Sequence, residues 1–501
     1  MIILLNPNYV VSRWDLFTTG VVYMPFGLAY FAANLKSKGL DVQVIDAFAE
    51  TPGFYREDDG FFVFGLTPPE VLARIPPDAR LVVLYAINMT AHISLIEIAK
   101  TIKSHRPDVV LIVLENSQAV TAYSLLRIQE DFYASGVDYI LTGNTEKSGP
   151  ILIQALLRGE KIPGIPGVGF RVGGQNHFSP ASVAADDQGP WKFPAWDLFP
   201  LENYWKLKFG HGPFQTKKYL PILSSRGCPY ECAFCVTPAT NNRRWQGRPA
   251  LDVVDEMQYC LDKFGVREFH FEDVNPTVSD DRIRAVCREI IKRNLPFIWK
   301  LVSGTKIETI KNEETIRLMA QAGCNYISFS PESGSPEVLK SINKPFDQRH
   351  AFRLLEAMRE NSIRSQACFV IGFPGETDAD RKLSADLVRK LTRAGVDEIA
   401  VFMITPVPGS RLFEEQDYRV DHYSQLNFSP TWRPDYEKLN RFRLHLYSNF
   451  ILWKLMYHPY TLLKQPFHFL SRTFYTKMEM VPYRVLKVRQ LIRKGARHAA
   501  I

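Results

Sequence analysis

Cysteine is scarce in this sequence, which has seven among 501 residues. A sparse and odd-numbered set does not build the disulfide framework of a small secreted protein, so we expect a reducing, cytoplasmic setting. Residues 1–227 contain no cysteine, whereas three of the seven lie between positions 228 and 235. Those three are candidates for metal binding, and the other four stand alone in the sequence.

Long apolar runs are also missing. No stretch of about 18 uninterrupted apolar residues occurs, so a membrane-spanning helix is not expected. The first residues, MIILLNPNYV, lack the basic segment of a signal peptide and are typical of a first β-strand. With 46% hydrophobic and 23% charged residues the composition is globular. The length predicts two or three domains.

Residues 1–160 alternate short apolar runs with helical patterns. The runs are rich in β-branched residues and almost entirely apolar, which is typical of strands covered on both faces. Five such units predict an α/β domain with a doubly wound, Rossmann-like sheet. The strands are expected at 2–6, 41–46, 80–86, 108–114 and 137–143. Residues 161–215, rich in Pro, Gly and aromatic residues, are interpreted as a linker.

A second α/β series occupies residues 216–415. Six strand candidates alternate with helical patterns, which predicts a partial (β/α)6 barrel with its chemistry at the carboxyl ends of the strands. The strand candidates are 218–227, 267–273, 296–302, 325–330, 364–373 and 396–404. Residues 416–501 lose this alternation and are expected to be mainly helical.

The three clustered cysteines follow the first strand candidate of the second series. Cys228, Cys232 and Cys235 form a C-x3-C-x2-C pattern in the run SSRGCPYECAFCVTP. Thiolates suit iron–sulfur clusters, and three of them can bind three irons of a four-iron cube while leaving one iron open. The alternative is a zinc site or free thiols. Zinc prefers four ligands, but no second cysteine pair lies nearby and the nearest histidine, His211, is distant in sequence.

Five segments together resemble the radical S-adenosylmethionine (SAM) superfamily. The cysteine motif, with Phe234 before its third cysteine, is similar to that family's signature. Four later segments resemble its other motifs in the same order: HFEDVNPT (270–277), ISFSPESGSPEVLKSINK (327–344), FVIGFPGET (369–377) and TPVPGSRLFEE (405–415). The resemblance implies a [4Fe–4S] cluster whose open iron is chelated by SAM, and cleavage of SAM to a 5′-deoxyadenosyl radical.

Carboxylates, hydroxyls and glycines at strand ends suit SAM, a zwitterion that carries an adenine. Acidic side chains can accept hydrogen bonds from its ammonium, hydroxyls can bind its ribose, and glycine lets the backbone approach closely. A solvated strand end or a helix cap is the competing interpretation of each carboxylate. Beside the cysteines, the candidate SAM residues are Phe234, Glu272, Asp273, Ser330, Glu332 and Gly372.

The N-terminal half resembles the cobalamin-binding subgroup of radical SAM enzymes. The similarity lies in PFGLAYFAANLKSKGLDVQVID (25–46) and in PAWDLFP (194–200). Two segments depart from that subgroup: ENSQ (115–118) stands where it often has G-G-x-H, and GNTE (143–146) where it often has G-E-G-E. The domain is therefore either cobalamin-binding or vestigial. The resemblance places cobalamin contacts at Asn88, Thr90, Glu115, Asn116, Gly143 and Glu146.

The resemblance implies a radical enzyme that abstracts hydrogen from an unactivated carbon of a small metabolite. The aromatic and basic C-terminal segment fits an apolar or lipid-like substrate. Cobalamin-dependent methyl transfer is the expected outcome, and radical cyclisation or rearrangement without methyl transfer is the alternative. RNA modification is a further alternative, but the related tRNA-modifying enzymes carry three additional N-terminal cysteines that this chain lacks. A flavodoxin or ferredoxin is the expected reductant.

The C-terminal segment is strongly basic and aromatic. Residues 441–501 contain twelve Lys and Arg against one acidic residue, Glu479, together with eleven aromatic residues. Three interpretations remain open. The segment is a helical cover of the barrel with solvated cations, or it associates with the inner face of a membrane, or it binds RNA by stacking and phosphate contacts. Nucleic acid is the least favoured of the three.

Overall fold

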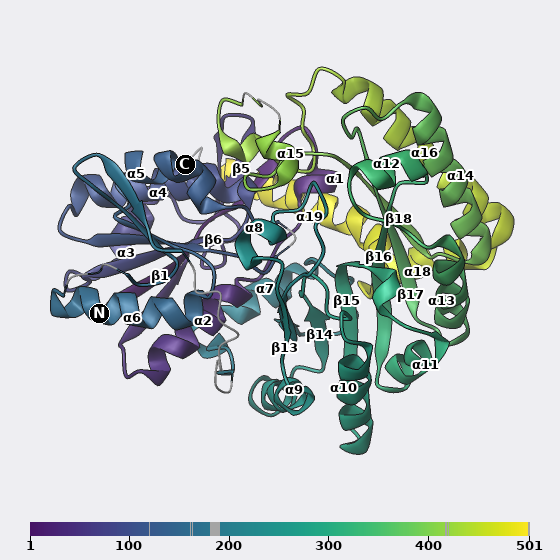
Figure 1. Cartoon of the computed structure of the whole chain (residues 1–501), viewed down its shortest axis with the longest axis horizontal. Helices are drawn as coiled ribbons and strands as arrows, with labels where there is room; N and C mark the ends of the chain where they lie inside the picture. Colours follow the sequence, from purple (N-terminus) through teal and green to yellow (C-terminus); the bar gives the residue numbers. More distant parts are fainter. Residues whose placement is uncertain are drawn as a thin grey trace.

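The computed structural model describes residues 1–498 except 120, 161, 163, 181–190, 416, 417 and 419, and it describes side chains as far as 493. The stretch 181–190 of the predicted linker and the last three residues of the predicted helical region therefore lie outside the described residues. Two α/β halves lie side by side, and the C-terminal helices run along one of them and across to the other (Figure 1).

The N-terminal half is built on a seven-stranded sheet with the order β10-β9-β8-β7-β6-β1-β3. Five of its strands are parallel and lie where the sequence predicts them: β1 (Ile2–Asn6), β3 (Val42–Asp46), β6 (Leu81–Ala86), β7 (Val110–Glu115) and β8 (Tyr139–Leu141). Helices cover both faces, which explains the continuous apolar runs. Helices α2 (Phe26–Ser37) and α6 (Thr145–Arg158) pack on one face, and α3 (Pro68–Arg74) and α4 (His92–His105) on the other (Figure 1).

The N-terminal sheet extends beyond the predicted boundary at residue 160. Strands β9 (Val168–Val172) and β10 (Gln175–Phe178) form an antiparallel hairpin on β8, inside the segment that the sequence analysis interpreted as a linker. Gly173 and Gly174 form the hairpin turn, both with positive φ (56° and 80°). A two-residue Gly-Gly turn of this kind matches the twist of paired strands. The linker assignment is therefore wrong for residues 168–178.

A second, unpredicted sheet lies beside the N-terminal half. It joins β2 (Tyr9–Ser12), β4 (Tyr55–Asp58) and β5 (Phe61–Phe64) in antiparallel pairs. The short helix α1 (Leu16–Thr19) follows β2 and is capped by Asp15, whose carboxylate accepts from Thr18 N–H at 2.9 Å. This sheet therefore holds α1 toward the C-terminal half.

The second half contains six parallel strands in unbroken chain order: β11 (Tyr219–Ile222), β14 (Glu268–Phe271), β15 (Ile298–Thr305), β16 (Cys324–Glu332), β17 (Arg364–Ile371) and β18 (Glu398–Met403). All six coincide with strand candidates of the sequence. The helices between them are α9 (Ala250–Phe264), α10 (Asp280–Lys292), α11 (Glu313–Gln321), α12 (Pro336–Ser341), α13 (Gln348–Glu360) and α14 (Asp378–Ala394). They pack outside the curved sheet (Figure 1).

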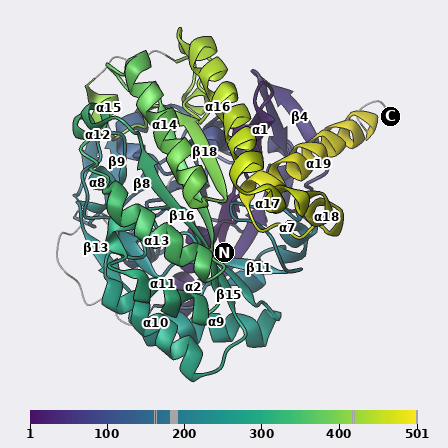
Figure 2. The ribbon, with the colours of Figure 1, turned by 90° about the vertical axis from the view of Figure 1, so that its right-hand side faces the viewer.

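The described part of the C-terminal region is mainly helical, as predicted. Its helices are α16 (Tyr436–Tyr457), α17 (Pro459–Leu463), α18 (Gln465–Ser471) and α19 (Lys477–His498). Helix α16 packs beside α14, and α19 runs from β18 to α1 and β4 (Figure 2). None of the helices in the described ranges is long and apolar enough to cross a bilayer.

Candidate functional site

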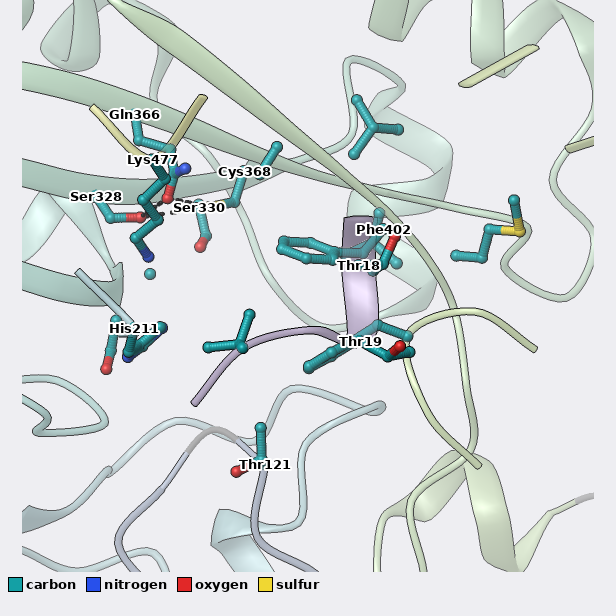
Figure 3. Close-up of a pocket in the computed structure, with 18 of the residues that line it drawn as sticks. Thr18, Thr19, Thr121, His211, Ser328, Ser330, Gln366, Cys368, Phe402 and Lys477 are labelled. Atoms are coloured by element: carbon teal, nitrogen blue, oxygen red, sulfur yellow. Dashed lines mark hydrogen bonds between the residues drawn. The ribbon is translucent and has the colours of Figure 1, made fainter. Parts of the chain in front are cut away.

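A cavity of about 980 Å³ lies between the two halves. Its walls come from the carboxyl ends of strands in both sheets, from α1 and from the C-terminal helices. Polar groups gather on one side, where Ser328, Gln366, Cys368 and Lys477 lie close together, while Phe402 and Thr18 lie apart from them (Figure 3). A cavity of this size is within the range of small-molecule and cofactor sites.

All three clustered cysteines line this cavity. They lie in the loop that follows β12 (Ser225–Gly227), beyond the end of β11. Burial raises the pKa of the Cys228 thiol to about 11 and that of Cys232 to about 12, and for Cys232 the nearby Lys344 ammonium opposes the rise. Buried thiols with raised pKa values become thiolates when a metal binds them.

The cysteine loop fits a four-iron cluster. Thr237 N–H donates to Cys235 Sγ at 3.4 Å, and backbone hydrogen bonds to sulfur are one of the devices that tune such clusters. Across the described ranges, no three His, Cys, Asp or Glu side chains converge closely enough to hold a single metal ion. A cube does not require such convergence, because each thiolate binds its own iron.

Three of the predicted SAM residues line the cavity beside the cysteines: Phe234, Ser330 and Glu332. Glu332 forms a buried ion pair with Lys344. Its backbone has φ of 63°, a left-handed conformation that is costly for a residue with a Cβ and concentrates at functional sites. Lys344 Nζ also lies 5.8 Å from the centre of the Phe234 ring. The loop that carries the cysteines is thus tied to the end of β16.

The other three predicted SAM residues are engaged with the protein itself. Glu272 Oε2 lies 2.7 Å from His211 Nδ1, and His211 lines the cavity. Asp273 is buried and accepts hydrogen bonds from Ser224 and Ser225. Gly372 lies outside the cavity lining, because Leu439 and Arg433 cover it from α16 and the segment before it.

Some of the predicted cobalamin residues line the cavity, and the others are bonded within the protein. Asn88 and Thr90 line the cavity at the end of β6. Glu115 accepts from the backbone N–H groups of Leu125 and Gly143, both at 3.3 Å. Asn116 donates to the Ile87 carbonyl at 2.8 Å, and Glu146 pairs with Arg226 at 2.6 Å.

The N-terminal side of the cavity also offers an unsatisfied polar group. Thr121 lines the cavity, and its buried hydroxyl has no hydrogen-bond partner in the structure (Figure 3). Ala119 and Ala122 complete this wall with small side chains. A wall of small residues with an unpaired hydroxyl fits a large organic cofactor.

The segment ENSQ (115–118), which differs from the pattern of the cobalamin-binding subgroup, joins the two halves of the molecule. Gln118 Oε1 accepts from Gly227 N–H at 3.0 Å, and its Nε2 donates to Asn241 Oδ1 at 3.0 Å. Asn241 Nδ2 in turn donates to the Ser117 carbonyl at 2.9 Å. Because Gly227 directly precedes Cys228, this contact fixes the start of the cysteine loop against the N-terminal sheet.

Sequence reasoning missed the polar floor of the cavity. Lys477, the first residue of α19, donates through Nζ to the Val302 carbonyl at 2.7 Å. Burial lowers its pKa, although the Cys368 thiol and Glu398 act in the opposite sense. Gln366 and Cys368 reach the floor from β17 and Ser328 from β16. No local pattern marks Lys477, because it is one of many cations in a basic segment.

Residues 222–388 match the family model of the radical SAM superfamily. The matched segment contains the three cysteines and the strands from β14 to β17. It therefore covers the predicted cluster ligands and all the predicted SAM residues, and a radical SAM domain implies a [4Fe–4S] cluster and SAM.

Two curated proteins align with most of the chain. An uncharacterized methyltransferase of Pyrococcus horikoshii is 25% identical over 414 residues, covering 83% of this chain and 82% of that protein. The cytidylyl-2-hydroxyethylphosphonate methyltransferase of Streptomyces wedmorensis is 27% identical over 470 residues, covering 83% and 81%. Both alignments extend well beyond the radical SAM segment, into the other parts of the chain.

Among solved structures, the chain is similar to the radical SAM methyltransferase TsrM of Kitasatospora setae. The structure with tryptophan and a SAM analogue has a TM-score of 0.62 at 20% identity, covering 83% of this chain and 75% of that one. The structure with cobalamin and a [4Fe–4S] cluster has a TM-score of 0.61 at 17% identity, covering 83% and 74%. At this identity the likeness establishes a shared fold.

Proposed function

The chain belongs to the radical SAM superfamily, whose domain it carries at residues 222–388, and on that premise we propose that it methylates an unactivated carbon of a small apolar or lipid-like metabolite with the help of cobalamin. One observation carries the proposal. The cysteine loop of one half and the strand ends of the other line the same cavity, so that a cluster, SAM and cobalamin can face one substrate.

The order of the strands supports this arrangement. We propose that the parallel sheet of residues 1–160 is a Rossmann-like domain of the cobalamin-binding type, and that the six sequential strands form a partial (β/α)6 radical SAM barrel. The five parallel strands of the N-terminal sheet, the six parallel strands of the second sheet and the similarity to TsrM support this assignment. In both folds, ligands bind at the carboxyl ends of the strands.

Residues of this chain would hold the cofactors in place for the reaction. Cys228, Cys232 and Cys235 would hold the cluster, and Ser330 and Glu332 would orient SAM beside it. When bound, the cluster and SAM supply a radical that removes hydrogen from the substrate, and cobalamin supplies the methyl group. The mainly apolar lining of the cavity would limit the water around a reactive carbon radical and so protect it from quenching.

Cobalamin would be held by the N-terminal wall. Asn88 and Thr90 would contact it directly, together with the unpaired hydroxyl of Thr121. Glu115, Asn116, Gly143 and Glu146 would act by holding the strand ends in place, through the internal hydrogen bonds and the ion pair that they form.

Radical cyclisation or rearrangement without methyl transfer is the second candidate. The Glu115 carboxylate is hydrogen-bonded across the ends of β7 and β8, where the resembling subgroup has small glycines. A side chain that occupies the space at these strand ends favours an N-terminal domain without cobalamin. Related anaerobic magnesium-protoporphyrin IX monomethyl ester cyclases, such as that of Rubrivivax gelatinosus, align with 48% of this chain.

The lining of the cavity supports the proposed substrate class. Phe402, Val370 and Met403 contribute apolar surface to the cavity lining, and Lys477 and Gln366 contribute polar groups. An apolar metabolite with one polar group matches this distribution. A flavodoxin or ferredoxin would deliver the electron to the cluster.

Anaerobic reconstitution tests the proposal. We expect brown protein that releases 5′-deoxyadenosine from SAM on reduction, and loss of both properties in Cys232→Ala. Cys260→Ala is the matched control, because Cys260 is buried in the core away from the cavity. Unchanged iron content in Cys232→Ala would refute the cluster assignment. Corrin absorbance after purification with cobalamin supports methyl transfer, and its absence supports cyclisation.

A further inference from the structure

Helix α16 carries apolar residues on its solvent side as well as on its buried side. Its buried side includes two cations, Arg443 and Lys454. Arg443 pairs with Asp15 at 3.1 Å, and Lys454 donates to the Val396 carbonyl at 2.8 Å. The solvent side instead carries five large apolar residues, all of them exposed: Leu444, Ile451, Leu452, Leu455 and Met456. A helix that served only as a cover would bury this side.

The next two helices continue the exposed apolar surface. Helices α17 and α18 have no buried residue. Tyr460, Leu463, Phe467 and Leu470 are 72% to 80% exposed. The two helices lie at the end of α16 (Figure 2). We call these four residues and the five of α16 the outer apolar face. Contiguous apolar surfaces of this kind mark binding sites in water-soluble proteins.

The outer apolar face reaches the mouth of the cavity. Leu444 and Ile451 belong both to this face and to the cavity lining. Trp14 and Phe17, on either side of the start of α1, also line the cavity and are 73% and 63% exposed. The opening of the cavity is therefore rimmed by apolar side chains from both ends of the chain.

The exposed Lys and Arg side chains of residues 441–472 have no acidic residue among them. Arg441, Lys464 and Arg472 are exposed on α16–α18 and at their ends. The single acidic residue of the segment 441–501, Glu479, is partly buried and accepts from Tyr475 N–H at 3.0 Å. An apolar surface flanked by cations, without free carboxylates from its own segment, complements an anionic lipid bilayer. A protein partner would have to match the cations with its own acidic residues.

We infer that the outer apolar face docks on an anionic lipid bilayer, and that the substrate passes from the bilayer into the cavity between α1 and α16. The docking is independent of the radical chemistry, whereas the passage of substrate rests on the proposed function. The α17–α18 segment enters the interfacial layer of the bilayer, and Lys464 and Arg472 meet the headgroups.

Vesicle sedimentation tests the docking. The probe is full-length reconstituted protein with vesicles of phosphatidylcholine and phosphatidylglycerol in equal amounts, or of phosphatidylcholine alone. We expect sedimentation with the anionic vesicles and weaker sedimentation with the neutral ones. The double variant Leu463→Glu, Phe467→Glu should bind the anionic vesicles roughly tenfold or more weakly, because two apolar insertions are lost. Leu251→Glu, on the exposed side of α9, is the matched control and should bind like the wild type.

Two readouts separate this inference from the proposed function. 5′-Deoxyadenosine release should be unchanged in the double variant, which also shows that it folds. Cys232→Ala should sediment like the wild type although it lacks the cluster. The inference is overturned if the wild type stays in the supernatant, or if the double variant still sediments. It is also overturned if the wild type forms a dimer in solution that the double variant abolishes, because the face is then covered by a second copy.

Discussion

At the scale of single residues, buried charges join the two halves. Arg248 Nη1 donates to Glu256 Oε2 at 2.7 Å, and both side chains are almost fully buried. Tyr30, from α2 of the N-terminal half, donates to the other oxygen of the same carboxylate at 2.5 Å. A buried pair of this kind is costly to break on one side, because the remaining charge has no compensation.

Arg248→Met should therefore destabilise the protein by about 3–5 kcal/mol, since it leaves Glu256 buried without its cation. Chemical denaturation of the protein without cluster measures the change. Arg353→Met is the control, because Arg353 is exposed and lies 3.8 Å from Glu313, and it should cost less than about 1 kcal/mol. Equal effects of the two substitutions would contradict this account of the interface.

Glu115 should make stability depend on pH. Burial raises the pKa of Glu115 from 4.5 to about 7, so between these values the folded state keeps a proton that the unfolded state loses. The free energy of unfolding should therefore fall as the pH rises from 4.5 to 7, by at most about 3 kcal/mol. The free energy of unfolding of the Glu115→Gln variant should depend less steeply on pH over this range. Parallel pH profiles for the two proteins would show that folding does not raise the pKa of Glu115.

At the scale of elements, strands were predictable and their partners were not. The parallel strands are continuous apolar runs, and a run such as RLVVLYA has the same signature wherever it lies. The hairpin at 168–178 was not predicted, because it lies in a segment rich in Pro and Gly that has no clear strand pattern. Its Gly-Gly turn is nevertheless a hairpin signal. In the β2–β4–β5 sheet, β2 pairs with β5 about 50 residues away, and no local pattern encodes such pairing. Strands β4 and β5 form a local hairpin, and its Asp59-Gly60 turn is a hairpin signal that the prediction missed.

The site shows the same division between local and long-range information. The cysteine spacing, Phe234 and Glu332 are local motifs, and the structure brings them together at the cavity. Lys477 reaches the floor because α19 begins against Glu398, which accepts from the Lys477 N–H at 3.1 Å across 79 residues of sequence. That placement depends on the packing of whole helices, so the sequence of the tail could not reveal it.

The Gln118 contact makes a prediction about the cysteine loop. Gln118→Ala removes the acceptor for Gly227 N–H and the donor to Asn241, so the loop before Cys228 should move more freely. We expect the reconstituted variant to lose iron to a chelator several-fold faster than the wild type. Gln258→Ala is the control, because Gln258 contacts Asp262 on the exposed side of α9. Equal rates of iron loss in all three proteins would show that Gln118 does not hold the loop.

At the scale of the whole molecule, the two halves and the C-terminal helices build one cavity. The second half contributes the cysteine loop, the N-terminal half contributes the wall around Asn88 and Thr121, and α19 contributes Lys477. None of these parts encloses the cavity alone. The central claim is that three thiolates at its edge hold a cluster with one iron open to SAM.

Electron paramagnetic resonance of the reduced, reconstituted protein, recorded with and without SAM, tests this claim most directly. If SAM binds the open iron, the signal of the cluster should change when SAM is added, because the coordination of that iron changes. A cluster signal that is identical with and without SAM, or bound zinc in place of iron, would contradict the account.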